Sequence, residues 1–402
     1  MPVLAAMRLM TLNEIWNRPE LMTALAIAIA FGGIMTACAY LILLERKLSA
    51  WMQDRVGPNR VGPAGLLQPL ADGAKFILKE EIIPDHVDKV LYILAPSLSV
   101  FTTMLAFCVV PFGDVPAESP ASQVFPFIIA PGIDLGIVFI FAITSLSVYG
   151  IILGGWASNN KYSALGSLRA SAQVVSYEIP LGMSVVGIAL LSHTMNLEKI
   201  LYAQAEAGFF GWNIWTQPVA CLIFFIAAMA ESNRLPFDLT ECEQELVGGF
   251  HTEYSGMKFA MFFLGEYTHV ITISFLTSIL FFGGWHFPWI AETTSAYAGA
   301  WAVKVGVLLT KAFMVIVLIQ MLRWTIPRFR FDQLMGLAWK VLIPLATVNV
   351  LIVMCVLEFG VPHYWLGPLS LASLVAASLI GMQGRPITAI TASPVLAPAR
   401  HH

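Results

Sequence analysis

The sequence predicts an all-α fold, a polytopic bundle of transmembrane helices. Of its 402 residues, 58% are hydrophobic and 12% are charged, whereas a soluble domain is about half apolar and about 25% charged. Apolar runs recur along the chain at the roughly 20-residue length that crosses about 30 Å of hydrocarbon. The alternating pattern of a membrane barrel is not visible. A backbone surrounded by lipid must therefore satisfy its polar groups within helices.

Nine apolar runs are candidate membrane spans. In chain order they cover residues 21–44, 91–111, 132–156, 171–192, 217–230, 257–284, 300–322, 335–357 and 364–382. The fifth run is short, and glycine, proline and serine interrupt the ninth. We expect residues 1–383 to form a single transmembrane domain. Residues 384–402 are rich in proline, alanine and threonine, and we expect them to be a disordered tail.

The positions of lysine and arginine set the orientation of these spans. Basic residues gather in the loops after the first, third, fifth and seventh runs, which are residues 45–90, 157–170, 231–256 and 323–334. The opposite loops contain almost none, Lys199 being the main exception. The odd-numbered loops are therefore expected to be cytoplasmic, with the N-terminus on the other side of the membrane.

The first cytoplasmic loop combines a rigid part and an amphipathic part. Arg-Val-Gly-Pro occurs twice, at 55–58 and 60–63, and glycine and proline in this arrangement exclude helix and fix tight turns. From Leu66 to Lys79, apolar residues alternate with charged ones at helical spacing. This pattern favours a short helix lying at the membrane surface, and a solvated linker is the alternative.

In the loop after the seventh run, residues 327–332 alternate basic and aromatic side chains. Such a segment is typical of a membrane-interface anchor. Docking of an acidic surface of a partner is the alternative.

Motifs for redox cofactors, nucleotides or metals are not visible. The sequence contains neither a phosphate-binding P-loop nor a Gly-x-Gly-x-x-Gly turn between strand and helix. Its five cysteines are scattered, without a Cys-x-x-Cys pair. We therefore expect no NAD, flavin, iron–sulfur cluster or metal to be bound by this chain. The net charge of −3 also argues against a nucleic-acid partner.

Ionisable residues lie inside predicted spans, Glu178 and Lys311 among them. Glu178 lies in the fourth run, where a charged side chain costs roughly 3 kcal/mol, and Pro180 loosens the nearby backbone hydrogen bonding. A permanently protonated glutamate that holds two helices together is the alternative. Lys311 lies near the middle of the seventh run, too deep to reach water easily. Glu266 in the sixth run is its candidate partner, chosen on depth alone.

Six carboxylates and one arginine lie within residues 231–253, between two apolar runs. Crowded carboxylates beside hydrocarbon cannot all ionise cheaply, so some should share or shift protons. A helix after Pro236 would place three of them on one face. These three are Asp238, Glu241 and Glu245. Helix capping is the alternative role for Glu241 and Glu243, whereas Glu231 precedes any such helix.

Eight segments of the chain are recognisable as the motifs of one family. They are ERK at 45–47, DRVGPNR at 54–60, QPLADGAK at 68–75, GWASN at 155–159, AESNR at 230–234, PFDLTE at 236–241, ELVGGF at 245–250 and PRFRFDQL at 327–334. Together they resemble the H subunit (chain 1) of the proton-pumping NADH:quinone oxidoreductase, respiratory complex I. The resemblance covers roughly residues 20–357, with eight spans in the same order.

The resemblance implies a membrane subunit of a proton-translocating enzyme in the bacterial inner membrane, with a periplasmic N-terminus. Quinone is the substrate, and electrons arrive from an iron–sulfur cluster in a neighbouring subunit. The positions that match the family's quinone chamber are Glu45, Arg46, Arg55, Asp72 and Asp238. The positions that match its proton relay are Glu178, Glu231, Glu241, Glu243 and Glu245. For Arg46, an ordinary charge at the membrane interface is the alternative.

The implied partners are the soluble quinone-module subunits, at the cytoplasmic loops, and the small membrane subunits beside the chain. The ninth run departs from the family, which usually ends after eight spans. Two other functions stay open from the sequence. One is the membrane anchor of a related hydrogenase or F420-type oxidoreductase. The other is a secondary transporter, which should show two related halves, and no such repeat is visible.

Overall fold

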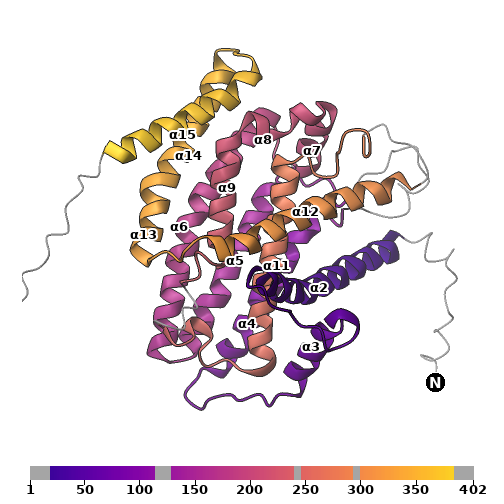
Figure 1. Ribbon diagram of the computed structural model, residues 1–402, viewed down its shortest axis with the longest axis vertical. Helices are drawn as coiled ribbons and strands as arrows, with labels where there is room; N and C mark the ends of the chain where they lie inside the picture. Colours follow the sequence, from indigo (N-terminus) through magenta and orange to yellow (C-terminus); the bar gives the residue numbers. More distant parts are fainter. Residues whose placement is uncertain (1–18, 114–127, 240–245, 293–298, 384–402) are drawn as a thin grey trace, which may run out of the picture.

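The computed structural model describes residues 19–113, 128–239, 246–292 and 299–383 (Figure 1). Within these ranges the chain is a bundle of helices, and the only β-structure is an isolated bridge between Phe287 and Ala291. The predicted all-α fold is therefore confirmed. The predicted disordered tail lies outside the described residues.

Seven helical segments are long and apolar enough to cross a membrane. They are α2 (Pro19–Met52), α4 (Lys89–Leu105) with its continuation η3 (Ala106–Val109), α5 (Gly136–Ala157), α6 (Lys161–Ser192), α11 (Gly256–Phe281), α12 (Ala300–Thr325), and the continuous run of α13 (Phe331–Leu337), η7 (Ala338–Leu342) and α14 (Ile343–Glu358). The apolar helix α9 (Pro218–Glu231) has 14 residues, and α15 (Leu366–Gln383) has 18. Each of the nine predicted runs thus lies on a helix.

Capping residues explain helix boundaries that hydropathy alone misplaces. Helix α6 begins at Lys161, ten residues before the predicted run, because the Asn160 side chain accepts a hydrogen bond from the backbone N–H of Tyr162. The same device starts α7 (Leu197–Glu206), where Asn196 accepts from the second and third N–H groups of the helix. Helix α7 and the four-residue α8 (Asn213–Thr216) were not predicted.

The amphipathic helix of the first loop is confirmed as α3 (Gln68–Leu78). Leu70, Ile77 and Leu78 are exposed on it, as expected for a helix that lies on a membrane surface. The preceding turn requires glycine at position 65, where φ is +79° and an added Cβ would lie 2.2 Å from the carbonyl oxygen of Pro58. Helix α3 lies beside the C-terminal end of α2 (Figure 1).

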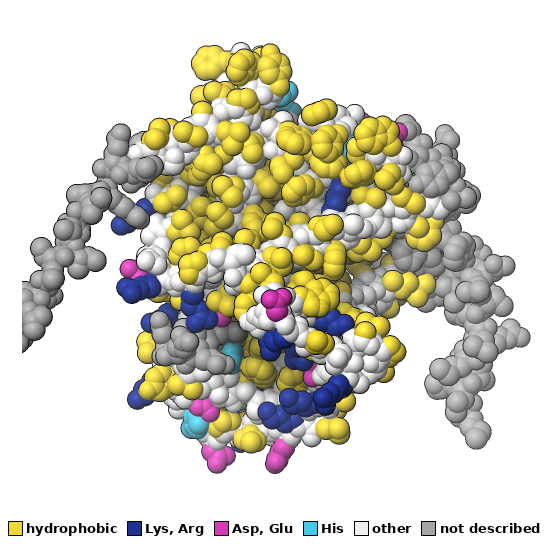
Figure 2. Space-filling view, in the orientation of Figure 1, with side chains coloured by type: hydrophobic (Ala, Val, Ile, Leu, Met, Phe, Trp, Pro, Cys, Tyr) yellow, Lys and Arg dark blue, Asp and Glu magenta, His cyan; other side chains and the backbone are white. Residues whose placement is uncertain are grey.

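Helix α11 is the centre of the bundle and packs against α2, α4, α9 and α12. Most of its side chains from Tyr267 to Phe281 are buried. Small residues allow close approach: an added Cβ on Gly265 would lie 2.8 Å from the Ser99 hydroxyl of α4. Figure 2 shows a broad hydrophobic surface, with charged side chains gathered toward the end of the molecule that carries α3. This distribution suits a protein that crosses a bilayer.

Candidate functional site

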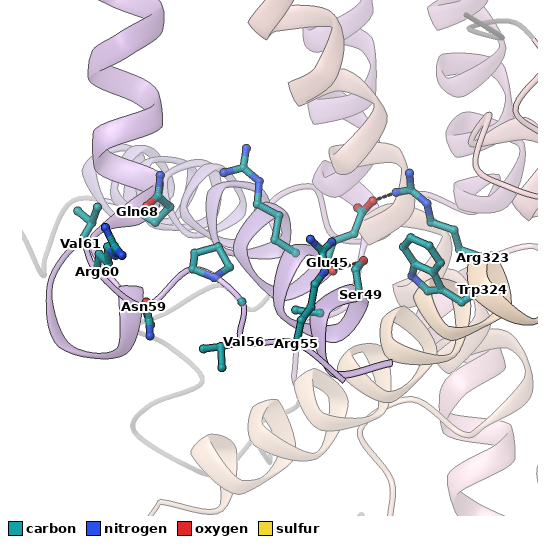
Figure 3. A pocket seen from close by; sticks show the side chains of 14 residues that line it. Glu45, Ser49, Arg55, Val56, Asn59, Arg60, Val61, Gln68, Arg323 and Trp324 are labelled. Atoms are coloured by element: carbon teal, nitrogen blue, oxygen red, sulfur yellow. Dashed lines mark hydrogen bonds and ion pairs between the residues drawn. The ribbon is translucent and has the colours of Figure 1, made fainter. Parts of the chain in front are cut away.

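A cavity of about 780 Å³ opens where the C-terminal end of α2 meets the loop that follows it (Figure 3). The end of α12 forms the opposite wall. The cavity is lined by Glu45, Arg46, Ser49, Ala50, Arg55, Val56, Gly57, Pro58, Asn59, Arg60, Val61, Gln68, Arg323 and Trp324. Four arginines and one carboxylate among these residues make it a strongly charged space beside the membrane-crossing helices.

Glu45 is the centre of the buried charge network at this cavity. Its carboxylate accepts a hydrogen bond from the Tyr267 hydroxyl at 2.8 Å and forms ion pairs with Arg323 and, at 3.5 Å, with Arg234. Figure 3 shows Arg323 reaching Glu45 from α12. Arg234 also lies 4.0 Å from Glu266. Because a buried charge is costly unless it is paired, this network fixes the C-terminal parts of α2 and α12 to the middle of α11.

Arg46 and Asp72 connect α2 to the surface helix α3. The Arg46 guanidinium donates to the Asp72 carboxylate at 2.7 Å, and the Gln68 side chain donates to the same carboxylate at 3.2 Å. The Arg46 side chain is still 48% exposed. The pair therefore positions a guanidinium at the cavity wall without burying it.

The five residues predicted for the quinone chamber are only partly brought together. Glu45, Arg46 and Arg55 line the cavity, and Asp72 is attached to it through Arg46. Asp238 is not among the lining residues, and its carboxylate pairs with Arg328 at 3.0 Å. The neighbouring Phe329 ring stacks on Phe237, with centroids 5.5 Å apart. The loop after α12 therefore packs on the loop after α9, within this chain.

A second group of ionisable residues lies within the bundle. Glu231 is the last residue of α9 and is 8% exposed. The Glu178 carboxyl on α6 acts on it electrostatically, and the α5 hydroxyls of Thr144 and Ser145 interact with Glu231 and Glu178, respectively. His269 on α11 places Nε2 at 3.6 Å from Oε1 of Glu231. Residues from four helices therefore meet at one buried polar site.

Three predicted relay residues, Glu241, Glu243 and Glu245, lie outside the described residues, as does most of the helix predicted after Pro236. Within the described ranges, no group of three or more His, Cys, Asp or Glu side chains could hold a metal ion.

The predicted pairing of Lys311 with Glu266 is wrong. Lys311 Nζ donates to the backbone carbonyls of Phe282 at 2.6 Å, Gly284 at 2.9 Å and His286 at 2.6 Å. The backbone turns just beyond the end of α11, where carbonyl groups lack partners within the helix. These carbonyls satisfy the ammonium group, and Glu266 lies instead beside Arg234. The prediction failed because it compared only the depth of the two residues in the membrane, and depth does not show which face of its helix each side chain occupies.

Sequence reasoning missed four residues of the site. Arg323 and Arg234 were noted as basic residues of their loops, Arg234 also as part of the motif at 230–234, and Tyr267 and His269 not at all. The available signal lay in the sixth run, where two ionisable side chains, Glu266 and His269, are three residues apart within a membrane-length segment. Such spacing places two polar groups on neighbouring positions of one helix.

Fold and site together define a polytopic helical membrane protein with a charged cavity at one end and buried carboxylates within its bundle. The sequence matches the family described as NADH dehydrogenase over residues 25–354. An NADH-quinone oxidoreductase H subunit of Koribacter versatilis, the one numbered 2, is 49% identical over 328 residues, which are 79% of this chain and 92% of that protein. The chain belongs to this family and is a membrane subunit of NADH-quinone oxidoreductase, complex I.

Two further relatives agree. The NADH-quinone oxidoreductase H subunit numbered 1 of Cytophaga hutchinsonii is 45% identical over 326 residues, or 80% of this chain and 92% of that protein. The corresponding H subunit of Protochlamydia amoebophila is 47% identical over 317 residues, or 79% of this chain and 92% of that protein. The family match ends at residue 354, so α15 lies beyond it.

Proposed function

We propose that this chain forms much of the quinone-binding chamber of NADH-quinone oxidoreductase, together with an acidic path that couples quinone reduction to proton translocation. The observation that carries the proposal is the cavity lined by Glu45, Arg46, Arg55 and Arg323, which opens beside a surface helix at the expected membrane boundary. Its volume of about 780 Å³ falls within the range of small-molecule sites.

The chemistry of a quinone head group suits this cavity. A quinone presents two carbonyl oxygens, which accept hydrogen bonds from guanidinium groups. Reduction by two electrons places negative charge on these oxygens until two protons arrive. Cationic side chains that are fixed before the reaction stabilise that charge, especially where little water is present. Arg46, Arg55 and Arg323 are the side chains in position to do so.

The buried carboxylates supply the proton path of the proposal. Negative charge developing in the cavity favours proton binding by neighbouring acidic groups and can draw protons along a chain of them. Glu231 is buried and Glu178 is partly buried, Glu178 acts on Glu231 electrostatically, and each interacts with a hydroxyl group of α5. Glu241, Glu243 and Glu245 would extend the path from the loop after α9.

The remaining surfaces fit assembly into a larger complex. The other subunits of the oxidoreductase are the partners. We place the soluble quinone-module subunits against the loops 45–90 and 323–334, and the small membrane subunits beside the helices. The membrane would be the bacterial inner membrane, with those loops cytoplasmic and the N-terminus periplasmic, because the basic residues gather on the loop side.

Photolabelling tests the chamber. A photoreactive quinone analogue, applied to the intact complex and illuminated, should label peptides that contain residues 45–61 or 323–324. Excess unlabelled quinone should suppress this labelling, which controls for unspecific reaction with the membrane. Labelling confined to peptides of other subunits, or to lipid-facing helices of this chain, would contradict the proposal.

A further inference from the structure

His269 is a buried histidine whose polar atoms have no evident structural use. It lies on α11 and is 6% exposed, and among the described residues neither ring nitrogen has a hydrogen-bond partner. Buried polar groups are nearly always hydrogen-bonded, because an unpaired one costs free energy. Two unpaired nitrogens on one buried ring therefore call for an explanation.

His286 shows how a histidine with a structural role is held in this protein. Its side chain is equally buried, at 3% exposed, but Nδ1 accepts a hydrogen bond from the indole Nε1–H of Trp212 at 3.2 Å. Such a bond fixes both the orientation of the ring and its tautomer. The ring of His269 has no comparable restraint within the described part of the chain.

In the described part of the chain, the acidic group that lies against the His269 imidazole is the carboxyl of Glu231. Nε2 lies 3.6 Å from Oε1, so a side-chain movement of about 0.5 Å would bring the two atoms within hydrogen-bond distance. Neighbouring polar groups of α11 are engaged elsewhere. Thr268 contacts Cys38 of α2 at 3.3 Å, and Tyr267 donates to Glu45.

We propose that His269 is a proton-carrying partner of Glu231, so that the relay runs from Glu178 on α6 through Glu231 on α9 to α11. This inference rests on the proposed function, because it assigns a further residue to the same proton path. It adds an imidazole, which is a base, to a path otherwise composed of carboxyl groups.

The proton transfer is a simple exchange between the two side chains. An imidazolium of His269 gives the proton on Nε2 to the Glu231 carboxylate, which leaves a neutral imidazole and a neutral carboxylic acid. One N–H bond breaks and one O–H bond forms. Because the pair has no net charge before or after the transfer, the exchange avoids an uncompensated charge in the bundle.

The two ring nitrogens allow the proton to be replaced. After the transfer the neutral imidazole keeps the proton on Nδ1, and its vacant Nε2 can take up the next proton, because imidazole binds protons at both nitrogens. Once Glu231 has passed its proton toward the cavity and Nε2 has been reprotonated, the exchange can repeat. An amide side chain of similar size can form hydrogen bonds but cannot take up a proton at physiological pH.

The test compares His269→Gln with a matched control, His286→Gln, in the purified complex reconstituted into vesicles. Proton uptake is measured with a pH-sensitive dye during NADH oxidation by quinone. We expect His269→Gln to slow proton pumping at least about tenfold, the low end of what a proton-transferring side chain contributes. His286→Gln should pump normally. NADH oxidation by ferricyanide, which reports on the soluble arm, should be unchanged in both.

Three outcomes separate the inference from the function on which it rests. Loss of pumping in Glu231→Gln and in His269→Gln supports both. Loss in Glu231→Gln with normal pumping in His269→Gln overturns the role of His269 and leaves the carboxylate relay intact. Normal pumping in both variants overturns the relay itself.

A spectroscopic readout covers the case in which His269→Gln fails to assemble. Infrared difference spectra of the wild-type complex, recorded on quinone reduction with ¹⁵N-labelled histidine, should contain an imidazole band that reports a change of protonation. His269→Asn, a second amide variant, should lack this band. An unchanged band in an assembled His269→Asn complex, or the absence of any histidine band in the wild type, would overturn the assignment.

Discussion

At the scale of single residues, Glu45 shows how a buried charge is made tolerable. It is held by two arginines and a tyrosine hydroxyl that come from three different segments of the chain. Removal of one partner from a buried ion pair is far more costly than removal of both, because the remaining charge is left uncompensated. The network at Glu45 should behave in this way.

We predict that Arg234→Gln destabilises the complex and that Glu45→Gln added to it restores part of the loss. The side chains of both residues are at most 15% exposed. The free energy of unfolding should therefore fall by about 3 kcal/mol in the single variant. Thermal denaturation of the purified complexes measures the difference. A double variant as unstable as the single one would show that the pair does not carry the stability.

The sequence could indicate Glu45 but not its partners. Motif resemblance points to residues one at a time, and hydropathy shows only that an arginine lies near the end of a span. Which arginine meets which carboxylate depends on helix rotation and packing, as at Arg323 on α12. The wrong partner chosen for Lys311 has the same origin.

At the scale of elements, Lys311 joins α12 to the end of α11. Its ammonium group donates hydrogen bonds to three backbone carbonyls at the turn after α11. The same group lies 4.3 Å from the centroid of the Trp212 ring. The contact is a helix-capping interaction provided by a side chain from the neighbouring helix.

Lys311→Met should loosen this junction while leaving the cavity intact. Each carbonyl that loses its donor and stays buried costs about 1–3 kcal/mol, so the variant complex should denature at a clearly lower temperature. Quinone reduction at low temperature should be nearly normal. Lys340→Met, which removes an exposed lysine from η7, is the control. Equal melting temperatures for the two variants would exclude the capping role.

Helix α15 is the element that the family match does not cover. It packs on α9 and α14 through its first turns, where Leu366 and Ser370 are buried, whereas Val375 and Leu379 are exposed. The sequence could predict this helix from its apolar run, but not its position, because interrupted apolar runs carry no orientation signal.

Deletion of residues 362–402 should leave quinone-driven proton pumping within about twofold of wild type, because α15 contacts neither the cavity nor Glu231. It should lower stability, since Val353, Val356 and Leu366 form one small apolar cluster. Pumping assays and thermal denaturation measure the two effects. Loss of pumping from a fully assembled truncated complex would assign α15 a role in turnover.

At the scale of the whole molecule, the fold could be predicted more completely than the site. Nine apolar runs and the capping asparagines specify the helices locally, and each run is a helix in the structure. The buried polar site depends on α5, α6, α9 and α11 packing together, and no local pattern specifies that arrangement. Glu178 and Glu231 could be identified individually, whereas the meeting of Glu231 with His269 required the tertiary structure.

The central claim is that carboxylates within the helix bundle of this subunit carry protons when quinone is reduced. The most direct measurement is the number of protons translocated per NADH oxidised, by reconstituted complexes carrying Glu178→Gln, Glu231→Gln or both. We predict a large fall in that number for each single variant and little further loss in the double variant, because both act in one path. A wild-type number in the assembled double variant would contradict the claim.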